Sequence, residues 1–191
     1  MGVLILVRHG QTAANVAGLL LGRADPPLTE RGQRQARAIA AALPAPSLLI
    51  SSPLRRAQDT AAAFGLPVQV DERWIEMDYG DVDGQLVDSV TAEVWSQWRA
   101  DPMFVPAGGE SVAAVGERVR RACADLVDAA NQGDVVVISH VSPIKVAIAW
   151  ALGVPDTVAW RMYVADAAVA RVKTGPPAPL LMSFNEVFPF E

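Results

Sequence analysis

Three short apolar runs constrain most strongly what this chain can fold into. They consist entirely of valine, isoleucine and leucine and cover Val3–Val7, Leu48–Ile50 and Val135–Ile138. Runs of this kind, without alternating polar residues, are typical of strands that are buried on both faces of a parallel sheet. We therefore predict an α/β fold that is built on such a sheet.

Helical patterns separate these runs. Residues 27–43 carry apolar side chains at helical spacing behind Thr29, a residue suited to capping a helix. A helix is also predicted within residues 51–65, and a long amphipathic pattern covers residues 108–130. Residues 143–152 continue the series after the third run. Strand and helix therefore alternate along most of the chain.

Four further segments complete the prediction. Residues 66–70 predict a short strand, and residues 167–174 and 180–184 flank a proline-rich turn and predict a closing pair of strands. Residues 87–106 follow no single period, so we interpret them as a helical excursion from the sheet. With 191 residues, residues 1–191 are expected to form a single domain, because the length suits one well-buried core.

The net charge and the cysteine content indicate which binding partners and which cellular compartment to expect for this protein. The formal net charge is -5, which does not favour nucleic acid or anionic membranes, so we expect neither as a partner. Cys123 is the only cysteine and is expected to be a small core residue in a reducing compartment. The apolar run Val146–Val154 is too short to span a membrane, and no secretory signal precedes Val3. We therefore expect a cytoplasmic protein.

The two histidines of the chain both stand directly after an apolar run. His9 follows the first run, next to Arg8, and His140 follows the third. Arg55 and Arg56 come within one helical turn of the second run. Ligands of open α/β sheets bind at the carboxyl ends of the strands. If the three strands are parallel neighbours, the histidines, Arg8 and one of Arg55 and Arg56 converge there.

This combination of side chains predicts a site for a phosphoryl group. The guanidinium group presents a planar fork of donors that matches phosphate oxygens. Binding alone does not need two histidines, whereas an imidazole that faces phosphorus can act as a nucleophile and form a phosphohistidine. The leaving oxygen then needs a proton, and Glu76, which adjoins Trp74 and Ile75, is the best candidate acid.

Each of these residues also has a purely structural interpretation. A histidine that follows a strand is often a satisfied loop residue, and the two arginines could form a solvated helix face. Glu76 could pair with Arg73 on the surface. Asp78, Asp81 and Asp83 are more simply interpreted as a solvated acidic rim than as a metal cluster. Only the joint pattern favours a functional site.

The same residues carry a family resemblance. The segments LVRHGQTAAN, PLTERGQRQA, SSPLRRAQDTA, EMDYGDVDG, GGES and VVISH occur in the order that is found in the histidine phosphatase superfamily. The chain resembles the phosphoglycerate mutase-like branch of that superfamily, from Leu4 to beyond His140. The resemblance implies a three-layer α/β/α sandwich with a mostly parallel mixed sheet. It also implies chemistry without a metal or another cofactor.

The resemblance assigns a role to each site residue. It implies that His9 is the phosphorylated nucleophile and that Glu76 is the proton donor. It favours Arg56 over Arg55, because Arg56 directly precedes Ala57 as in the family motif. The residues that it implies for phosphate binding are Arg8, Asn15, Arg56 and His140.

Two departures from the family pattern bear on the function. Val141 replaces the glycine that usually follows the second histidine, which puts the shape of the pocket floor in question. The long insertion of the mutases between the acid loop and GGES is absent, so the site looks too open to retain a phosphoryl group. We therefore predict a metal-independent phosphomonoester phosphatase that acts on a small phosphorylated metabolite through a phosphohistidine, as a monomer or homodimer.

Other interpretations stay open at this point. One is phosphoryl transfer of the phosphoglycerate mutase type, and another is a non-catalytic module that binds phosphate. A dinucleotide-binding fold is disfavoured, because no Gly-x-Gly-x-x-Gly follows the first run. Six large side chains are expected either to wall the pocket or to form core: Trp74, Tyr79, Trp95, Trp98, Met103 and Phe104.

Overall fold

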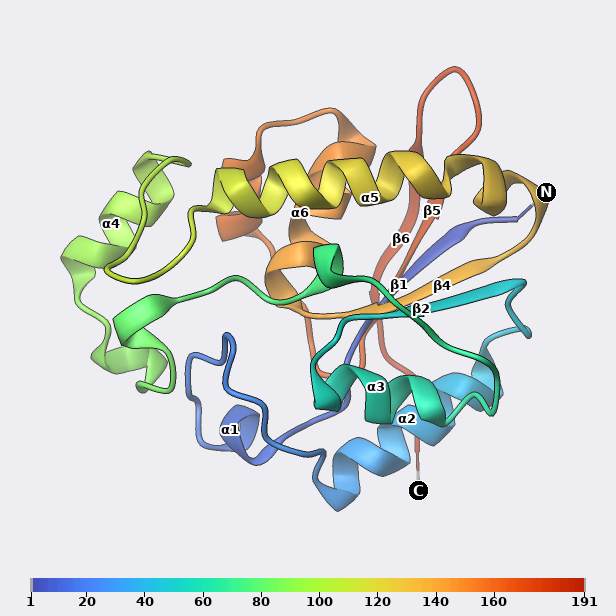
Figure 1. Cartoon of the computed structure of the whole chain (residues 1–191), viewed down its shortest axis with the longest axis horizontal. Helices are drawn as coiled ribbons and strands as arrows, with labels where there is room; N and C mark the ends of the chain where they lie inside the picture. Colours follow the sequence, from blue (N-terminus) through green and yellow to red (C-terminus); the bar gives the residue numbers. More distant parts are fainter. Residues whose placement is uncertain (1, 191) are drawn as a thin grey trace.

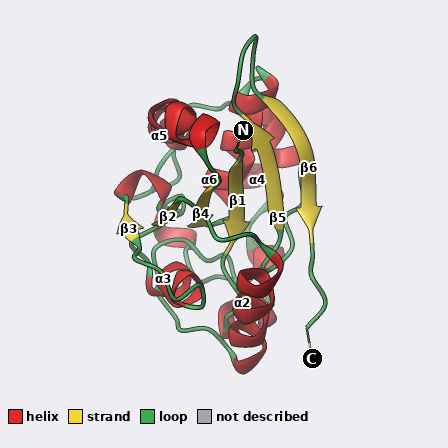
Figure 2. Ribbon diagram, turned by 90° about the vertical axis from the view of Figure 1, so that its right-hand side faces the viewer, coloured by secondary structure: helices red, strands yellow, loops and turns green. Residues whose placement is uncertain are grey.

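The computed structural model describes residues 2–190 and contains one six-stranded sheet. The strand order is β3-β2-β4-β1-β5-β6 (Figure 2). The strands are β1 (Leu4–Arg8), β2 (Leu48–Ser51), β3 (Gln69–Val70), β4 (Val135–Ser139), β5 (Val169–Lys173) and β6 (Leu180–Glu186). Strands β1 to β4 are mutually parallel where they pair, and β5 runs antiparallel to both β1 and β6. The prediction of a mostly parallel mixed sheet is confirmed.

Helices cover both faces of this sheet and form its outer layers (Figure 1). Helices α5 and α6 lie on one side of the strands, and α2 and α3 lie on the other. The α-helices are α1 (Ala13–Val16), α2 (Glu30–Ala42), α3 (Arg55–Ala62), α4 (Ala92–Ala100), α5 (Val112–Gln132) and α6 (Val141–Leu152). Short 3₁₀ helices occupy Glu72–Trp74, Gly80–Val82, Val87–Ser89 and Asp156–Arg161.

The side chains of strand β1 alternate between two hydrophobic cores, one on each face of the sheet. Leu4 and Leu6 belong to the cluster that includes the buried faces of α5 and α6. Ile5 and Val7 point to the opposite face, where the cluster includes residues of α2 and α3. All four side chains have no exposed surface, which explains why the run lacks polar residues. The predicted three-layer α/β/α sandwich is therefore confirmed.

Most predicted elements are present, with different ends. Thr29 caps α2, and its hydroxyl accepts a hydrogen bond from the Gly32 N–H at 3.0 Å. The strand predicted for residues 66–70 is wrong in extent, since β3 contains two exposed residues. An edge strand that is exposed gains little from burial, so its apolar pattern is a poor guide to its length. No helix within residues 2–190 is both long and apolar enough to cross a membrane.

Candidate active site at the carboxyl ends of the strands

Strands β1 and β4 bring the two histidines together. Arg8 and Ser139 pair in register at the ends of these parallel neighbours, and His9 and His140 follow directly. The two imidazole centroids lie 5.1 Å apart. Strand β2 pairs with the other side of β4, and the turn after β2 leads into α3, which carries Arg56. Residues far apart in the sequence therefore meet at one edge of the sheet.

His9 is held in one tautomer. Its Nδ1 lies 2.7 Å from the Gly10 carbonyl oxygen, which can only accept, so we assign the proton to Nδ1. Nε2 then carries a lone pair and accepts a hydrogen bond from Arg56 Nε at 3.3 Å. Burial lowers the pKa of His9 well below its usual value, and the charges of Arg8 and Arg56 lower it further. A neutral imidazole with an unprotonated Nε2 is a potential nucleophile.

Arg56 is fully buried and fixed by backbone carbonyls. Its Nη1 donates to the Ala24 carbonyl at 2.6 Å, and its Nη2 donates to the Gly22 carbonyl at 2.8 Å. Burial lowers the pKa of Arg56. Arg55 points outward instead, and its guanidinium is paired with Asp59 at 3.4 Å on the exposed helix surface. Of the two adjacent arginines, only Arg56 reaches the histidines.

His140 is also buried and neutral. Its Nε2 lies 2.7 Å from the Ser52 hydroxyl oxygen, and its Nδ1 has no hydrogen-bond partner among the described residues. Burial lowers the pKa of His140 well below its usual value, and the nearby charge of Arg56 adds to this shift. A buried polar atom without a partner is costly and often marks a ligand site.

Arg8 and Asn15 line the same pocket as His9. Arg8 donates from Nη1 to the Val164 carbonyl at 2.8 Å and pairs through Nη2 with Asp166 at 2.9 Å, while its buried Nε has no partner among the described residues. The Asn15 side-chain oxygen accepts hydrogen bonds from the Thr12 N–H and hydroxyl, at 2.9 and 2.8 Å. This orientation leaves the amide NH₂ of Asn15 available as a donor.

Glu76 is buried beside the start of α6. Its Oε1 accepts hydrogen bonds from the backbone N–H groups of Met77 at 2.7 Å and Ser142 at 3.1 Å. The alternative in which Glu76 pairs with Arg73 is wrong. The Arg73 guanidinium instead binds Asp71, at 2.7 Å, because the two lie in the same short turn.

Asp83 has a role that the sequence did not reveal. Its carboxylate accepts hydrogen bonds from the backbone N–H groups of Gly22, Arg23 and Ala24, at 2.7 to 3.1 Å. Asp83 is only partly exposed, so its carboxylate has a structural role in addition to its place in the acidic rim. The carboxylate holds the loop whose carbonyls fix Arg56. No local spacing signals such a contact, because its partners lie about 60 residues earlier in the chain.

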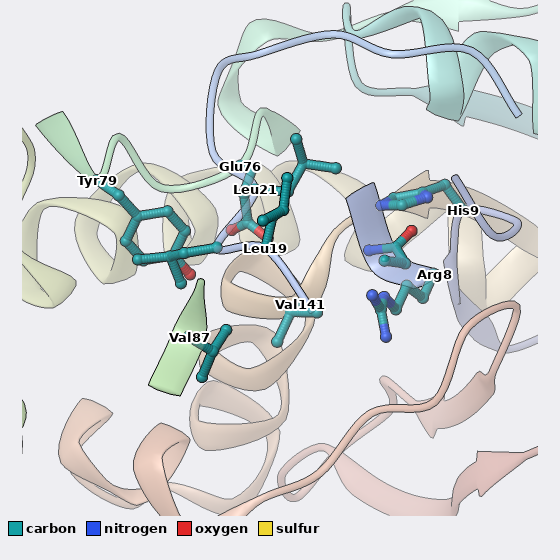
Figure 3. A pocket seen from close by; sticks show the side chains of 10 residues that line it. Arg8, His9, Leu19, Leu21, Glu76, Tyr79, Val87 and Val141 are labelled. Carbon is teal, nitrogen blue, oxygen red and sulfur yellow. The ribbon is translucent and has the colours of Figure 1, made fainter. Parts of the chain in front are cut away.

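Arg8, His9, Asn15 and Glu76 line a pocket of about 180 Å³ (Figure 3), whereas Arg56 and His140 lie behind His9 and do not line it. Arg8 and His9 lie on one side of this view, and Leu19, Leu21, Val87 and Val141 lie on the other side together with Glu76 and Tyr79. Groups of three or more histidine, cysteine or acidic side chains arranged to hold a metal ion are absent from residues 2–190. The lining residues are Arg8, His9, Asn15, Leu19, Leu20, Leu21, Glu76, Tyr79, Val87 and Val141.

The large side chains expected either in the pocket wall or in the core are now placed. Tyr79 lines the pocket, and its hydroxyl lies 3.0 Å from the Ser142 hydroxyl. Trp98 is fully buried and stacks at a centroid distance of 5.7 Å on Trp160. Met103 is exposed. The remaining three, Trp74, Trp95 and Phe104, belong to or pack against the main core.

Val141 fits its position without backbone strain. It is the first residue of α6 and does not have a positive φ, so the conformational freedom of glycine is not required there. Its side chain lines the pocket instead. The departure from the family pattern therefore changes the surface of the pocket and leaves the course of the backbone intact.

The buried histidines predict a stability that falls in mild acid. Both have a pKa below the reference value of 6.5 in the folded state. Below about pH 6.5 the unfolded chain therefore binds protons that the folded chain excludes. The free energy of unfolding should be highest above this pH and should fall by up to about 1.4 kcal/mol per pH unit for each histidine.

Urea unfolding of the ligand-free protein between pH 7.5 and 5.5 measures this effect. A variant with both His9→Gln and His140→Gln should show a flatter dependence over the same range, because neither site then titrates. An equal slope in the two proteins would contradict the prediction.

Comparison with known proteins places the chain in a family. The model of the histidine phosphatase superfamily (branch 1) matches residues 4–187. Phosphoserine phosphatase 1 of Hydrogenobacter thermophilus is 36% identical over 192 residues, covering 95% of this chain and 91% of that protein. Among solved structures, a mycobacterial glucosyl-3-phosphoglycerate phosphatase in complex with VO3 is 32% identical, with a TM-score of 0.86. That match covers 97% of this chain and 99% of the other.

A bifunctional protein of Mycobacterium tuberculosis is 36% identical over 170 residues, which cover 84% of this chain. The chain spans 47%, about half, of the length of that relative. The family match nevertheless extends over nearly all of the present chain, and the fold agrees with the solved relative. This chain belongs to branch 1 of the histidine phosphatase superfamily.

Proposed function

We propose that this protein is a phosphomonoester phosphatase that acts through a phosphohistidine on His9 and needs no metal ion. The observation that carries the proposal is the tautomer of His9. Its Nδ1 is bonded to the Gly10 carbonyl, so the unprotonated Nε2 is presented beside Arg56 and within 5.1 Å, ring to ring, of His140. The relatives described above support it, since two of them are named as phosphatases.

The first chemical step is transfer of the phosphoryl group to the enzyme. When the substrate binds, Arg56 Nε turns from Nε2 of His9 to a phosphoryl oxygen and frees the Nε2 lone pair. Nε2 then attacks phosphorus in line with the ester oxygen, a nitrogen–phosphorus bond forms, and the bond from phosphorus to the ester oxygen breaks. Glu76 gives its proton to the departing oxygen, so that a neutral alcohol leaves. Arg8, Arg56 and Asn15 donate hydrogen bonds to the equatorial oxygens, on which negative charge concentrates.

The second step is hydrolysis of the phosphohistidine. The Glu76 carboxylate takes a proton from water, and the water oxygen attacks phosphorus while the nitrogen–phosphorus bond breaks. Inorganic phosphate leaves, and Glu76 is protonated again for the next cycle. His140 serves both steps if the Ser52 hydroxyl donates to its Nε2, because its partnerless Nδ1 then carries a proton that it can donate to the phosphoryl group.

Hydrolysis is favoured over phosphoryl transfer within a substrate. A mutase must hold the phosphoryl group away from water while the substrate turns. Residues 77–107, between the acid and the GGES segment, contain one basic residue, Arg99, and two short 3₁₀ helices with α4. Such a segment offers no cationic cover for a retained bisphosphorylated intermediate.

A panel of phosphomonoesters, assayed from pH 5 to 8 with and without a chelator, tests the proposal. We expect release of inorganic phosphate that the chelator does not change. Movement of phosphate within a phosphoglycerate without release would favour the mutase. Binding of inorganic phosphate without release from any ester would favour a non-catalytic module.

The setting of the reaction is part of the same proposal. We place it in the cytoplasm, because the lone cysteine, Cys123, is fully buried in α5 and a reducing compartment suits it. We expect a monomer or a homodimer, with a small phosphorylated molecule as the substrate. Neither nucleic acid nor a membrane is expected as a partner, given the net charge of -5.

A further inference from the structure

One side of the active-site pocket is formed by aliphatic side chains (Figure 3). Leu19, Leu20 and Leu21 are consecutive residues of the loop after α1, and all three line the pocket. Val87 comes from a 3₁₀ helix and Val141 from the start of α6. We call these five residues the aliphatic wall. Three separate segments of the chain therefore place branched hydrocarbon groups beside the phosphoryl site.

The aliphatic wall is held by contacts between two loops. The Leu20 N–H donates to the Gln85 carbonyl at 2.8 Å, and the Gly84 N–H donates to the Leu20 carbonyl at 2.7 Å. Leu19 and Leu86 form an antiparallel bridge, so their side chains project from the same side of this ribbon. Leu86 is 54% exposed. The apolar surface thus continues from the pocket toward solvent.

Among the described residues that line this pocket, no charged group is left for the alcohol part of a substrate. Its charged or polar lining residues, Arg8, His9, Asn15 and Glu76, are all used by the phosphoryl chemistry proposed above. The remaining polar atom, the Tyr79 hydroxyl, already contacts the Ser142 hydroxyl at 3.0 Å. An ammonium or carboxylate group on the leaving alcohol would therefore lose water against the aliphatic wall and gain no partner.

Resting on the proposed phosphatase activity, we infer that the preferred substrates are monoesters of uncharged, mainly aliphatic alcohols. Phosphorylated amino acids, amino alcohols and hydroxy acids are poorer substrates, because each carries a charged group next to the ester. The aliphatic wall determines this specificity. Hydrocarbon that enters the pocket gains free energy by leaving water.

Pairs of esters with the same shape separate this inference from general reactivity. Propyl phosphate has the heavy-atom skeleton of phosphoethanolamine, and isobutyl phosphate has that of 2-phosphoglycolate. In each pair, we expect kcat/KM to be at least about tenfold higher for the ester whose alcohol part is uncharged. In the series from ethyl to hexyl phosphate, kcat/KM should rise about fourfold per methylene until the chain leaves the wall.

Variants of the wall test its role directly. Leu19→Asn and Leu21→Asn replace hydrocarbon by an amide of similar size and should move the ratio for each ester pair toward one. Leu180→Asn is the matched control, because Leu180 lies in β6 and is 59% exposed. It should leave the ratio unchanged. A ratio within one preparation does not depend on how much of a variant folds.

Two different failures can be told apart. Phosphate release that requires His9 but is equal or faster for phosphoethanolamine and 2-phosphoglycolate would overturn the inferred specificity and leave the phosphatase intact. Unchanged ratios in both wall variants would overturn the role of the wall. If no ester in the panel gives phosphate release that requires His9, the proposed function itself fails, and the inference falls with it.

Discussion

His9→Ala abolishes phosphate release, with an expected fall in kcat of about 10⁴-fold or more. Alanine removes the only side chain in the proposed mechanism that forms a bond to phosphorus. The remaining donors can still bind a phosphate ester, since the contacts of Arg8 with Val164 and Asp166 do not involve His9. The measurement is steady-state turnover of an alkyl phosphate, together with detection of acid-labile phosphate on the protein in a quenched reaction.

His140→Ala is the matched comparison, because both imidazoles are buried and neutral in the same site. It should lower kcat by about 10² to 10³-fold, as expected for loss of one donor to the transition state, and should still form the acid-labile phosphoprotein. Retained turnover in His9→Ala, or acid-labile phosphate in that variant, would remove His9 as the nucleophile.

Glu76→Gln slows turnover of alkyl phosphates by about 10² to 10⁴-fold, because an amide cannot give a proton to the leaving oxygen. The carboxylate is fixed by the N–H groups of Met77 and Ser142, and glutamine can keep these bonds through its carbonyl oxygen. The fold should therefore survive. With 4-nitrophenyl phosphate the first step should slow much less, since nitrophenolate leaves without a proton.

The same variant should then accumulate the phosphorylated enzyme. Activation of water also needs the carboxylate, so hydrolysis of the phosphohistidine slows while its formation from 4-nitrophenyl phosphate continues. A burst of nitrophenolate close to one equivalent per enzyme measures this. Glu117→Gln is the control, because this side chain is exposed on α5, where it pairs with Arg121. Equal losses for alkyl and nitrophenyl esters, without a burst, would argue against Glu76 as the acid.

The order of strands and helices followed from the sequence because burial on both sheet faces leaves a simple pattern. The same reasoning placed His9 and His140 together, since residues that directly follow parallel strands share an edge of the sheet. It could not choose between Arg55 and Arg56 without the family resemblance. That choice depends on the rotation of α3 about its axis, which tertiary packing decides.

Contacts between loops that are distant in the sequence could not be predicted from it. The bonds from Asp83 to the Gly22–Ala24 segment join two irregular regions, and no periodicity records them. The sequence left the placement of the aromatic residues between pocket wall and core open for a related reason. Trp98 and Tyr79 pack edge to face. Trp98 is fully buried in the core, whereas Tyr79 lines the pocket, so two aromatic side chains in direct contact have different roles.

The position of β4 between β1 and β2 has a consequence for biosynthesis. Strands β1 and β2 are synthesised first but do not pair with each other. Each pairs with β4 (Val135–Ser139), which lies between them and is synthesised later. A nascent or truncated chain that ends earlier lacks the strand with which both β1 and β2 pair. Such long-range pairing is slow to form. The pairing that brings His9 and His140 together is thus impossible until nearly three quarters of the polypeptide has been synthesised.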